Sequence, residues 1–209
     1  MQLQAVFFDF DGVILDSVDV KTQAFAHMFR SYGKQIEDAV VRYHLENGGV
    51  SRFEKFRYYY EQLLDKRISE KELNELNRQF SELVVEKVVE SPYIPGALET
   101  IKQLQENNIS AFVVSGTPEE EIVSIVQKKG ISNYFEEVHG SPRKKWQIVT
   151  DIIKREKYTP FRCLFIGDSL SDYEAAQYNT MQFLGIVYNH KTSIFPKGTA
   201  ISSYVNIQL

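Results

Sequence analysis

The hydrophobic pattern along the chain separates two kinds of segment. Residues 5–8 form an uninterrupted apolar run rich in aromatic and β-branched side chains, which is typical of a strand buried on both faces of a parallel sheet. Mainly apolar segments also occur at 109–114, 163–166 and 181–187, and residues 137–140 are a further, weaker strand candidate. From residue 97 onward these runs alternate with segments of helical periodicity, and the alternation predicts a parallel sheet with crossover helices.

Residues 18–90 show helical periodicity and no strand that would extend this sheet. The spacing of apolar residues predicts one helix over 20–32 and a weaker one over 38–47. Capping-box patterns predict the starts of two further helices, at Ser51 with Glu54 and at Ser69 with Glu72. The segment is therefore expected to be a helical insert that follows the first strand.

The return from this insert is marked by residues 91–96, which contain two prolines and one glycine. A helix is expected over 98–106 and another over 144–157. Thr117, Pro118 and the three glutamates that follow predict a further helix start, in which Thr117 caps the first turn.

Composition narrows the classes of partner. The chain has 24 basic and 28 acidic residues, a net charge of -4, which implies no nucleic-acid footprint. Its one cysteine, Cys163, has no intramolecular partner, so a reducing, cytoplasmic location is expected, with Cys163 as a small core residue. No apolar run of membrane-spanning length and no secretion signal is visible, so neither a membrane span nor export is expected.

Two carboxylates, Asp9 and Asp11, follow the first strand directly, and Gly12 comes after them. In an open α/β sheet the ligand crevice lies beyond the carboxyl ends of the strands. Two neighbouring carboxylates repel each other, so the pair favours a bound divalent cation or a raised pKa on one member. The alternative is a strand that merely ends in acidic turn residues.

Polar residues also follow the other predicted strands. They are Ser115 and Thr117 after the second, Lys144 and Lys145 at the helix after the third, and Asp168 and Asp172 after the fourth. Converging carboxylates are ligands that magnesium prefers, and a hydroxyl with an ammonium suits phosphate oxygens. Each residue alone also fits a turn, a solvated surface or a helix N-terminus. Their common position at strand ends favours a magnesium- and phosphate-binding site.

These motifs resemble those of the haloacid dehalogenase superfamily of aspartate-nucleophile phosphotransferases. The resemblance covers the whole chain and rests on D-F-D-G-V at 9–13 with Asp16-Ser17, on Ser115-Gly116-Thr117, and on G-D-S-L-S-D at 167–172. The helical insert matches the family's α-helical cap, as in the phosphoglycolate phosphatase and β-phosphoglucomutase branch.

The resemblance implies an α/β fold with a Rossmann-like three-layer core and a parallel sheet of strand order 5-4-1-2-3. Residues 1–17 and 91–209 would form this catalytic core, and residues 18–90 would form the α-helical cap domain inserted after the first strand.

The resemblance, together with the chemistry of the residues, implies a role for each. Asp9 would be the nucleophile and Asp11 the general acid and base. Magnesium would be bound by Asp9, the backbone carbonyl of Asp11 and Asp168, with Asp172 or Ser169 in support. Ser115, Gly116 and Lys145 would bind the phosphoryl oxygens.

The third motif of the family differs in this chain. Many members of the capped branch have a lysine followed by Pro-x-Pro-Asp, whereas this chain has G-S-P-R-K-K at 140–145. That pattern is similar to a G-S-P-x-x-K variant, which favours Lys145 over Lys144 as the phosphate-binding lysine. It also weakens a close assignment to β-phosphoglucomutase.

Arg52 and Lys55 occupy the position of the family's specificity loop and the helix after it. Three residues apart on one helix face, they are candidates for binding a second, anionic group of the substrate. The alternative is two solvated charges that balance Glu54 and Glu61.

The sequence therefore predicts a magnesium-dependent phosphatase that hydrolyses a small phosphorylated metabolite, a phosphate monoester, through an aspartyl-phosphate. Asp11 argues against a dehalogenase, because the family's dehalogenases lack it. A phosphomutase, a receiver-like phospho-accepting domain and a non-catalytic phosphate-binding protein remain as alternatives. The identity of the substrate and the oligomeric state are left open.

Overall fold

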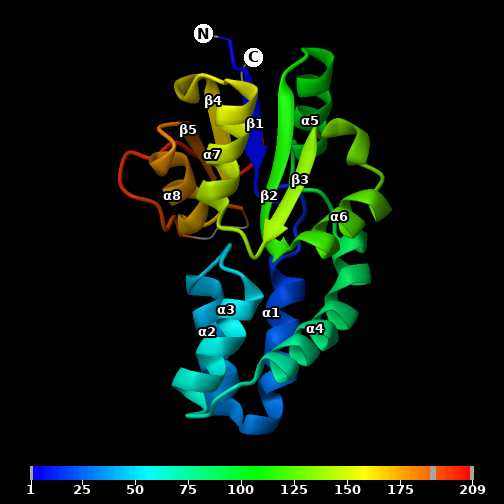
Figure 1. Cartoon of the computed structure of the whole chain (residues 1–209), viewed down its shortest axis with the longest axis vertical. Coiled ribbons are helices and arrows are strands. Elements are labelled where there is room, and N and C mark those ends of the chain that lie inside the picture. Colours follow the sequence, from blue (N-terminus) through cyan, green and yellow to red (C-terminus); the bar gives the residue numbers. More distant parts are fainter. Residues whose placement is uncertain (1, 189–191, 208–209) are drawn as a thin grey trace.

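A parallel sheet forms the centre of the computed structural model, which describes residues 2–188 and 192–207 (Figure 1). The strand order is β3-β2-β1-β4-β5-β6. The strands are β1 (Ala5–Phe8), β2 (Ser110–Pro118), β3 (Glu137–Ser141), β4 (Cys163–Gly167), β5 (Gln182–Ile186) and β6 (Ile201–Ser202). The predicted order 5-4-1-2-3 is confirmed, and the two-residue strand β6 extends it beside β5.

The central strand β1 is buried along its whole length because it has a strand on either side and helices on both faces. Its Phe7 lies opposite Phe112 of β2 and Phe165 of β4. The ring centroids of these pairs are 5.0 and 6.4 Å apart. Such cross-strand aromatic pairs stabilise the register, and the register sets where the residues after β1 emerge.

Two helix layers cover the sheet, as the alternating direction of strand side chains requires. Val6 and Phe8 point to the side of α5 (Ala97–Glu106) and α6 (Glu119–Lys128). Ala5 and Phe7 point to the side of α7 (Lys145–Glu156) and α8 (Leu170–Tyr178). The predicted three-layer α/β core is therefore present.

The helical unit, residues 18–90, lies beyond the carboxyl ends of the strands (Figure 1). It consists of α1 (Val18–Phe29), α2 (Lys34–Glu46), α3 (Arg52–Tyr58) and α4 (Glu70–Glu90), with a π-helical turn at Tyr59–Leu63. Its centre is a cluster of aromatic rings around Phe25, which contacts Phe56, Tyr59 and Phe80. The long helix α4 returns the chain to the sheet and packs beside α6. No helix among the described residues combines the length and the apolar character needed to cross a membrane.

The helix starts show where local signals decide the structure and where they do not. The capping box of Ser69 with Glu72 is present as predicted. The one predicted for Ser51 and Glu54 is wrong, because Ser51 makes no capping bond with its side chain and Glu54 instead accepts a hydrogen bond from Lys144 at 2.6 Å. A charged partner on the core replaces the local contact.

Strand β2 is longer than predicted, because it continues through Thr117 to Pro118. The predicted role of Thr117 as a helix cap is therefore wrong: α6 begins at Glu119, and its N-cap residue is Pro118. The extension carries the hydroxyl of Thr117 toward the residues that follow β1. Helix α2 begins at Lys34, four residues before the predicted start at Asp38.

Candidate active site

A cavity of about 300 Å³ lies between the carboxyl ends of the strands and the helical unit. From the core it is lined by Asp9, Asp11, Gly116 and Asp168, among others, and from the helical unit by Lys21, His44, Gly48, Gly49, Arg52 and Lys55. Cavities of this size hold small metabolites. The carboxylates predicted to share a site thus do lie together.

Lys145 lies between two buried carboxylates. Its Nζ is 2.9 Å from Asp9 Oδ1 and 2.6 Å from Asp172 Oδ1. Burial raises the pKa of Asp9, and the negative charge of Asp172 raises it further. Lys145 opposes both effects, but the pKa of Asp9 still reaches about 7. Burial alone would lower the pKa of Lys145, but the two carboxylates outweigh it and raise that pKa. The ammonium is therefore held charged at the base of the site.

The neighbouring Lys144 is directed elsewhere, since its Nζ pairs with Glu54 on the surface and about half of its side chain is exposed. The structure thus separates two lysines that adjoin in sequence. Lys145 begins α7 and faces the sheet, and Lys144 precedes that helix and faces solvent.

Three carboxylates form a candidate metal centre. Asp9, Asp168 and Asp172 each offer one oxygen, and the three oxygens lie within 4.8 Å of one another. Oxygen-only ligands of this charge suit magnesium, and a cation there would offset the repulsion that raises the pKa of Asp9. The residues present therefore fit a divalent cation. Asp172 also accepts hydrogen bonds from the backbone N–H of Ser169 at 3.1 Å and from its hydroxyl, and these bonds orient it.

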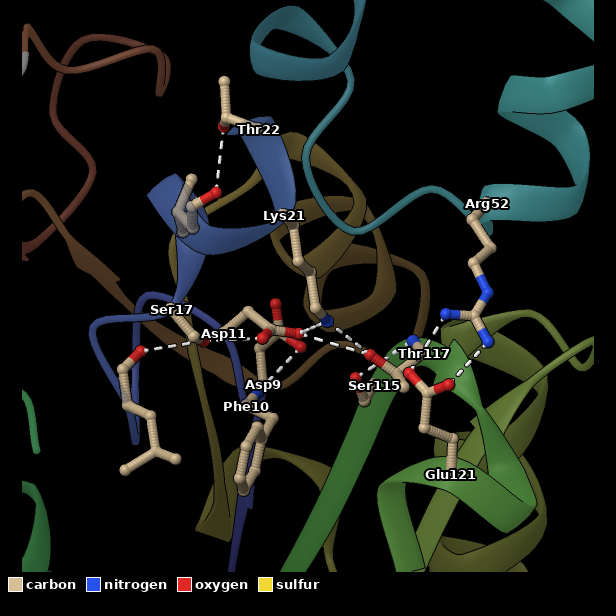
Figure 2. Close-up of polar contacts among 12 residues, drawn as sticks. Asp9, Phe10, Asp11, Ser17, Lys21, Thr22, Arg52, Ser115, Thr117 and Glu121 are labelled. Atoms are coloured by element: carbon tan, nitrogen blue, oxygen red, sulfur yellow. Dashed lines mark hydrogen bonds and ion pairs between the residues drawn. The ribbon is translucent and has the colours of Figure 1, made fainter. Parts of the chain in front are cut away.

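Asp11 has a separate set of partners (Figure 2). Its carboxylate accepts hydrogen bonds from Ser17 Oγ at 2.6 Å, from Thr117 Oγ1 at 3.3 Å and from Lys21 Nζ. Lys21 also donates to Thr117 Oγ1 at 2.7 Å. Burial would raise the pKa of Asp11, but Lys21 and the two hydroxyls outweigh it and hold that pKa below its usual range. The two carboxylates that follow β1 are therefore shifted in opposite directions.

Ser115 and Gly116 lie on the extended end of β2, next to this pair. The hydroxyl of Ser115 is buried and accepts a hydrogen bond from the backbone N–H of Thr117 at 3.1 Å. Gly116 lines the cavity, whereas, among the described residues, Ser115 does not. Ser115 thus lies just beneath the cavity surface.

The loop before α3 lies directly on the core. A side chain at Gly116 would collide with the backbone carbonyl of Gly49, and one at Gly49 would collide with Ser169 and Ser171. Only glycine permits so close an approach of the two backbones. The helical unit therefore closes one side of the cavity in this conformation.

The two basic residues proposed for substrate binding, Arg52 and Lys55, are both buried. Neither pairs with Glu54 or Glu61, so the alternative of two solvated charges is wrong. Arg52 donates to both carboxylate oxygens of Glu121 on α6, at 3.1 and 2.6 Å (Figure 2), and also to Ser81 and Asn77. Lys55 has a different environment, next to His44.

Lys21 and Glu121 were not predicted as site residues. Thr117 was predicted both as a polar residue at a strand end beside the site and as a helix cap, and it lies beside Asp11 and caps no helix. Lys21 did carry a signal: Val18, Lys21 and Phe25 lie three and four positions apart and share one helix face, so Lys21 interrupts an apolar face. Glu121 carried none, because three consecutive glutamates at a helix start already have a local explanation in the helix dipole.

An acidic cavity at the carboxyl ends of a parallel sheet, closed by an inserted helical unit, defines an α/β enzyme whose site is shared between core and insert. A family model described as haloacid dehalogenase-like hydrolase matches residues 3–179. The chain belongs to this family of hydrolases.

Relatives agree on the type of hydrolysis. The chain is 26% identical to phosphoglycolate phosphatase 1 of Pseudomonas aeruginosa over 193 residues, which cover 88% of this chain and 70% of the relative. It is 25% identical to a phosphorylated carbohydrates phosphatase of Thermotoga maritima, covering 84% and 81%. The chain is accordingly a phosphatase, a phosphoric monoester hydrolase.

Solved structures share the fold. A crystal structure of a predicted phosphoglycolate phosphatase from Haemophilus somnus matches with a TM-score of 0.74 and 21% identity over 96% of this chain and 94% of that one. A β-phosphoglucomutase from Clostridium difficile matches with a TM-score of 0.69 and 20% identity over 89% and 85%. Both the sheet and the inserted helical unit thus have counterparts in known structures.

Proposed function

We propose that this protein is a magnesium-dependent phosphatase that hydrolyses a small-molecule phosphate monoester through an aspartyl-phosphate. The observation that carries the proposal is the environment of Asp9. This carboxylate lines the cavity, is held by Lys145 and by the backbone N–H of Phe10 at 2.8 Å, and belongs to the three-carboxylate cluster. A carboxylate fixed in this way is suited to nucleophilic attack.

In the first step an Asp9 oxygen forms a bond to phosphorus while the bond from phosphorus to the leaving oxygen breaks, and Asp11 gives its proton to that oxygen. In the second step water attacks the aspartyl-phosphate, Asp11 accepts the proton of the water, and the bond from phosphorus to Asp9 breaks to release phosphate. The contacts of Lys21, Ser17 and Thr117 favour the carboxylate form of Asp11, which is the form that the second step needs. Asp11 must therefore take up a proton before the first step, and in later cycles it carries the proton that it accepted from water.

The metal site is assigned to Asp9, Asp168 and Asp172 with the backbone carbonyl of Asp11. When bound there, magnesium supplies positive charge to the phosphoryl oxygens and to the crowded carboxylates. Lys145, Ser115 and the backbone of Gly116 are assigned to the same phosphoryl group, where preorganised donors stabilise the transition state.

The helical unit of residues 18–90 is assigned as the cap, and residues 1–17 and 91–209 as the catalytic core. The close approach of Gly49 to Gly116 and the ion pair of Arg52 with Glu121 support this division, because both contacts join the unit to the core at the cavity. A closed cap excludes bulk water and confines the leaving group.

Phosphate release from a panel of small phosphorylated metabolites tests the proposal. We expect release in the presence of Mg²⁺ and a loss of about 100-fold or more in EDTA, restored by added Mg²⁺, because the carboxylate cluster then lacks its cation. Release that EDTA does not affect would contradict the metal assignment. Tight Mg²⁺-dependent binding of an ester without any release would instead favour a phosphomutase.

Glu121→Gln tests the contact between cap and core. The variant leaves Arg52 buried without its carboxylate partner, so we expect the free energy of unfolding to fall by about 2 kcal/mol, less than for a fully enclosed pair because Asn77 and Ser81 remain as partners. KM should rise severalfold, since the loop over the cavity is held less firmly. Urea unfolding and steady-state kinetics measure both effects. Glu120→Gln, at the exposed neighbouring position, is the control, and equal behaviour of the two variants would show that the ion pair does not hold the cap.

A further inference from the structure

One side of the cavity is apolar and has no part in the proposed phosphoryl transfer. It is formed by a set of core residues, here called the apolar wall, all of which line the cavity: Ile94, Ile186, Tyr188, Ile194 and Phe195. All of them belong to the sheet side of the molecule, and the helical unit contributes none of them. The apolar wall therefore offers the cavity a surface that differs in character from its charged residues.

The topology of the sheet places the apolar wall beside the carboxylates. Strands β4 and β5 are parallel neighbours, and Gly167 is paired with Gly185. The residues that follow these two glycines, Asp168 and Ile186, therefore leave the sheet side by side. Since Asp168 belongs to the three-carboxylate cluster, the apolar wall begins next to the place assigned to the metal and the phosphoryl group.

The segment after β5 is held against the sheet by specific packing. A side chain at Gly185 would collide with the ring of Phe195, so the glycine lets this ring lie directly on β5. The ring also contacts Phe183, with 5.1 Å between the centroids. Farther along, the backbone N–H of Val187 donates to the carbonyl of Ser202 in β6 at 2.8 Å. The sixth strand, which the predicted order 5-4-1-2-3 lacks, thus helps to fix one side of the cavity.

Ile194, the residue before the anchored ring, is the most exposed member of the apolar wall. It is 49% exposed, whereas Ile94 and Ile186 are 0% and 3% exposed. A single exposed isoleucine on an open surface is ordinary, but this one lines the cavity. Water is released from such a surface when an apolar group covers it, and this release favours binding. Ile194 therefore provides apolar area that a ligand of the cavity can cover.

We propose that the apolar wall determines specificity by contacting the leaving group, so that the preferred substrates are phosphate monoesters whose leaving group carries a short alkyl portion. This inference rests on the proposed phosphatase function and names a substrate class for the same site. The occupant follows from continuity, because a group attached to the bound phosphoryl oxygen lies next to Ile186. The cavity of about 300 Å³ limits this group to a small one.

A series of alkyl esters tests the proposal in the wild type. The leaving alcohols of methyl, ethyl, propyl and butyl phosphate have nearly the same acidity, so the series varies contact with the protein and little else. We expect kcat/KM to rise about threefold with each methylene, slightly less than full burial of a methylene gives. Propyl phosphate should exceed 2-hydroxyethyl phosphate, in which a hydroxyl replaces the terminal methyl, by about 10-fold. Equal kcat/KM for all these esters would overturn the proposal.

Ile194→Thr and Ile201→Thr form a matched pair of variants. Ile201 is as exposed as Ile194, at 50%, but it lies on β6 and is not one of the described residues that line the cavity. Threonine keeps the β-branch in both variants. In Ile194→Thr we expect the preference for propyl over 2-hydroxyethyl phosphate to fall to about threefold or less, whereas Ile201→Thr should keep the preference of the wild type. An unchanged preference in Ile194→Thr, or the same loss in both variants, would contradict the role of the apolar wall.

Calorimetry with alkylphosphonates separates this inference from the proposed function, because their phosphorus–carbon bond replaces the ester bond that is hydrolysed. With Mg²⁺ we expect the wild type to bind butylphosphonate about 10-fold or more tightly than methylphosphonate. If no ester released phosphate, the proposed hydrolysis would be contradicted, and this binding preference would still support the apolar wall. If esters were hydrolysed but the two phosphonates bound equally, the proposed function would stand and the role of the apolar wall would be contradicted.

Discussion

Asp9→Asn is expected to abolish phosphate release, with kcat lower by about 10⁴-fold or more, because an amide cannot form the aspartyl-phosphate that divides the reaction into two steps. Asparagine has nearly the same shape as aspartate and keeps an oxygen that can accept the hydrogen bonds of Phe10 and Lys145. The comparison therefore isolates the nucleophile. Single-turnover assays that trap the phosphoprotein measure this difference. The wild type should become phosphorylated, and the Asp9→Asn variant should not.

A stability measurement would test that the loss of activity in Asp9→Asn comes from the missing nucleophile and not from a loss of folding. In EDTA the pKa of Asp9 rises from 3.8 in the unfolded chain to about 7 in the folded protein. Between these values the folded state holds more protons than the unfolded state, so the stability of the wild type should fall as pH rises from about 4 to 7. The asparagine variant lacks this loss and should be the more stable protein at pH 8. A variant that keeps a large part of its activity would contradict the nucleophile assignment.

Lys145→Met is expected to lower kcat/KM by about 10³-fold, in the range found when one preorganised donor is removed from a transition state. The variant removes the cation that lies 2.9 Å from Asp9 and 2.6 Å from Asp172. Two buried carboxylates then face each other without it, so the free energy of unfolding in EDTA should fall by about 3 kcal/mol. Added Mg²⁺ should restore part of that loss.

Lys144→Met is the matched control for this prediction, because it changes the adjacent residue in the same way. Lys144 is exposed and pairs with Glu54 at the surface, so its replacement should change kcat/KM by no more than about twofold and stability by less than about 1 kcal/mol. Steady-state kinetics and urea unfolding of the two variants provide the comparison. Equal losses, or a larger loss for Lys144→Met, would show that the phosphate-binding lysine was assigned incorrectly.

Much of the fold could be predicted from local patterns. The predicted strand segments that begin at Ala5, Ile109, Glu137, Cys163 and Met181 all contain strands of the sheet. The clearest signals came from Ala5 and Cys163, because a strand buried on both faces has few polar positions. The all-helical character of residues 18–90 was also predicted locally, because the helical spacing of apolar residues continues over a long segment. Local capping signals were less reliable where a distant partner competed with a local one. Helix α3 begins directly after Ser51 as predicted but without the capping box, and Thr117 caps no helix.

The candidate site could be predicted where it depends on strand ends. Asp9, Asp11, Asp168 and Asp172 follow strands whose order is set by the topology of a parallel α/β sheet, so their convergence followed from the pattern of elements. The partners of these carboxylates could not be predicted in the same way. Lys21 and Thr117 reach Asp11 from a helix and a strand whose separation in space no local pattern contains.

By itself, the sequence determined the class of fold, the position of the helical insert and the set of carboxylates, because each depends on periodicity or on position along one strand. The sequence also favoured Lys145 over Lys144, but the contacts that distinguish two similar side chains exist only in the tertiary structure. It places Lys145 between Asp9 and Asp172 and leaves Lys144 at the surface. It pairs Arg52 with Glu121, whereas Lys55 lines the cavity next to His44 and has no carboxylate partner within the described part of the chain. The physical reason is that the energy of a charge depends on its burial and on the partners within a few ångströms, and those partners come from distant parts of the chain.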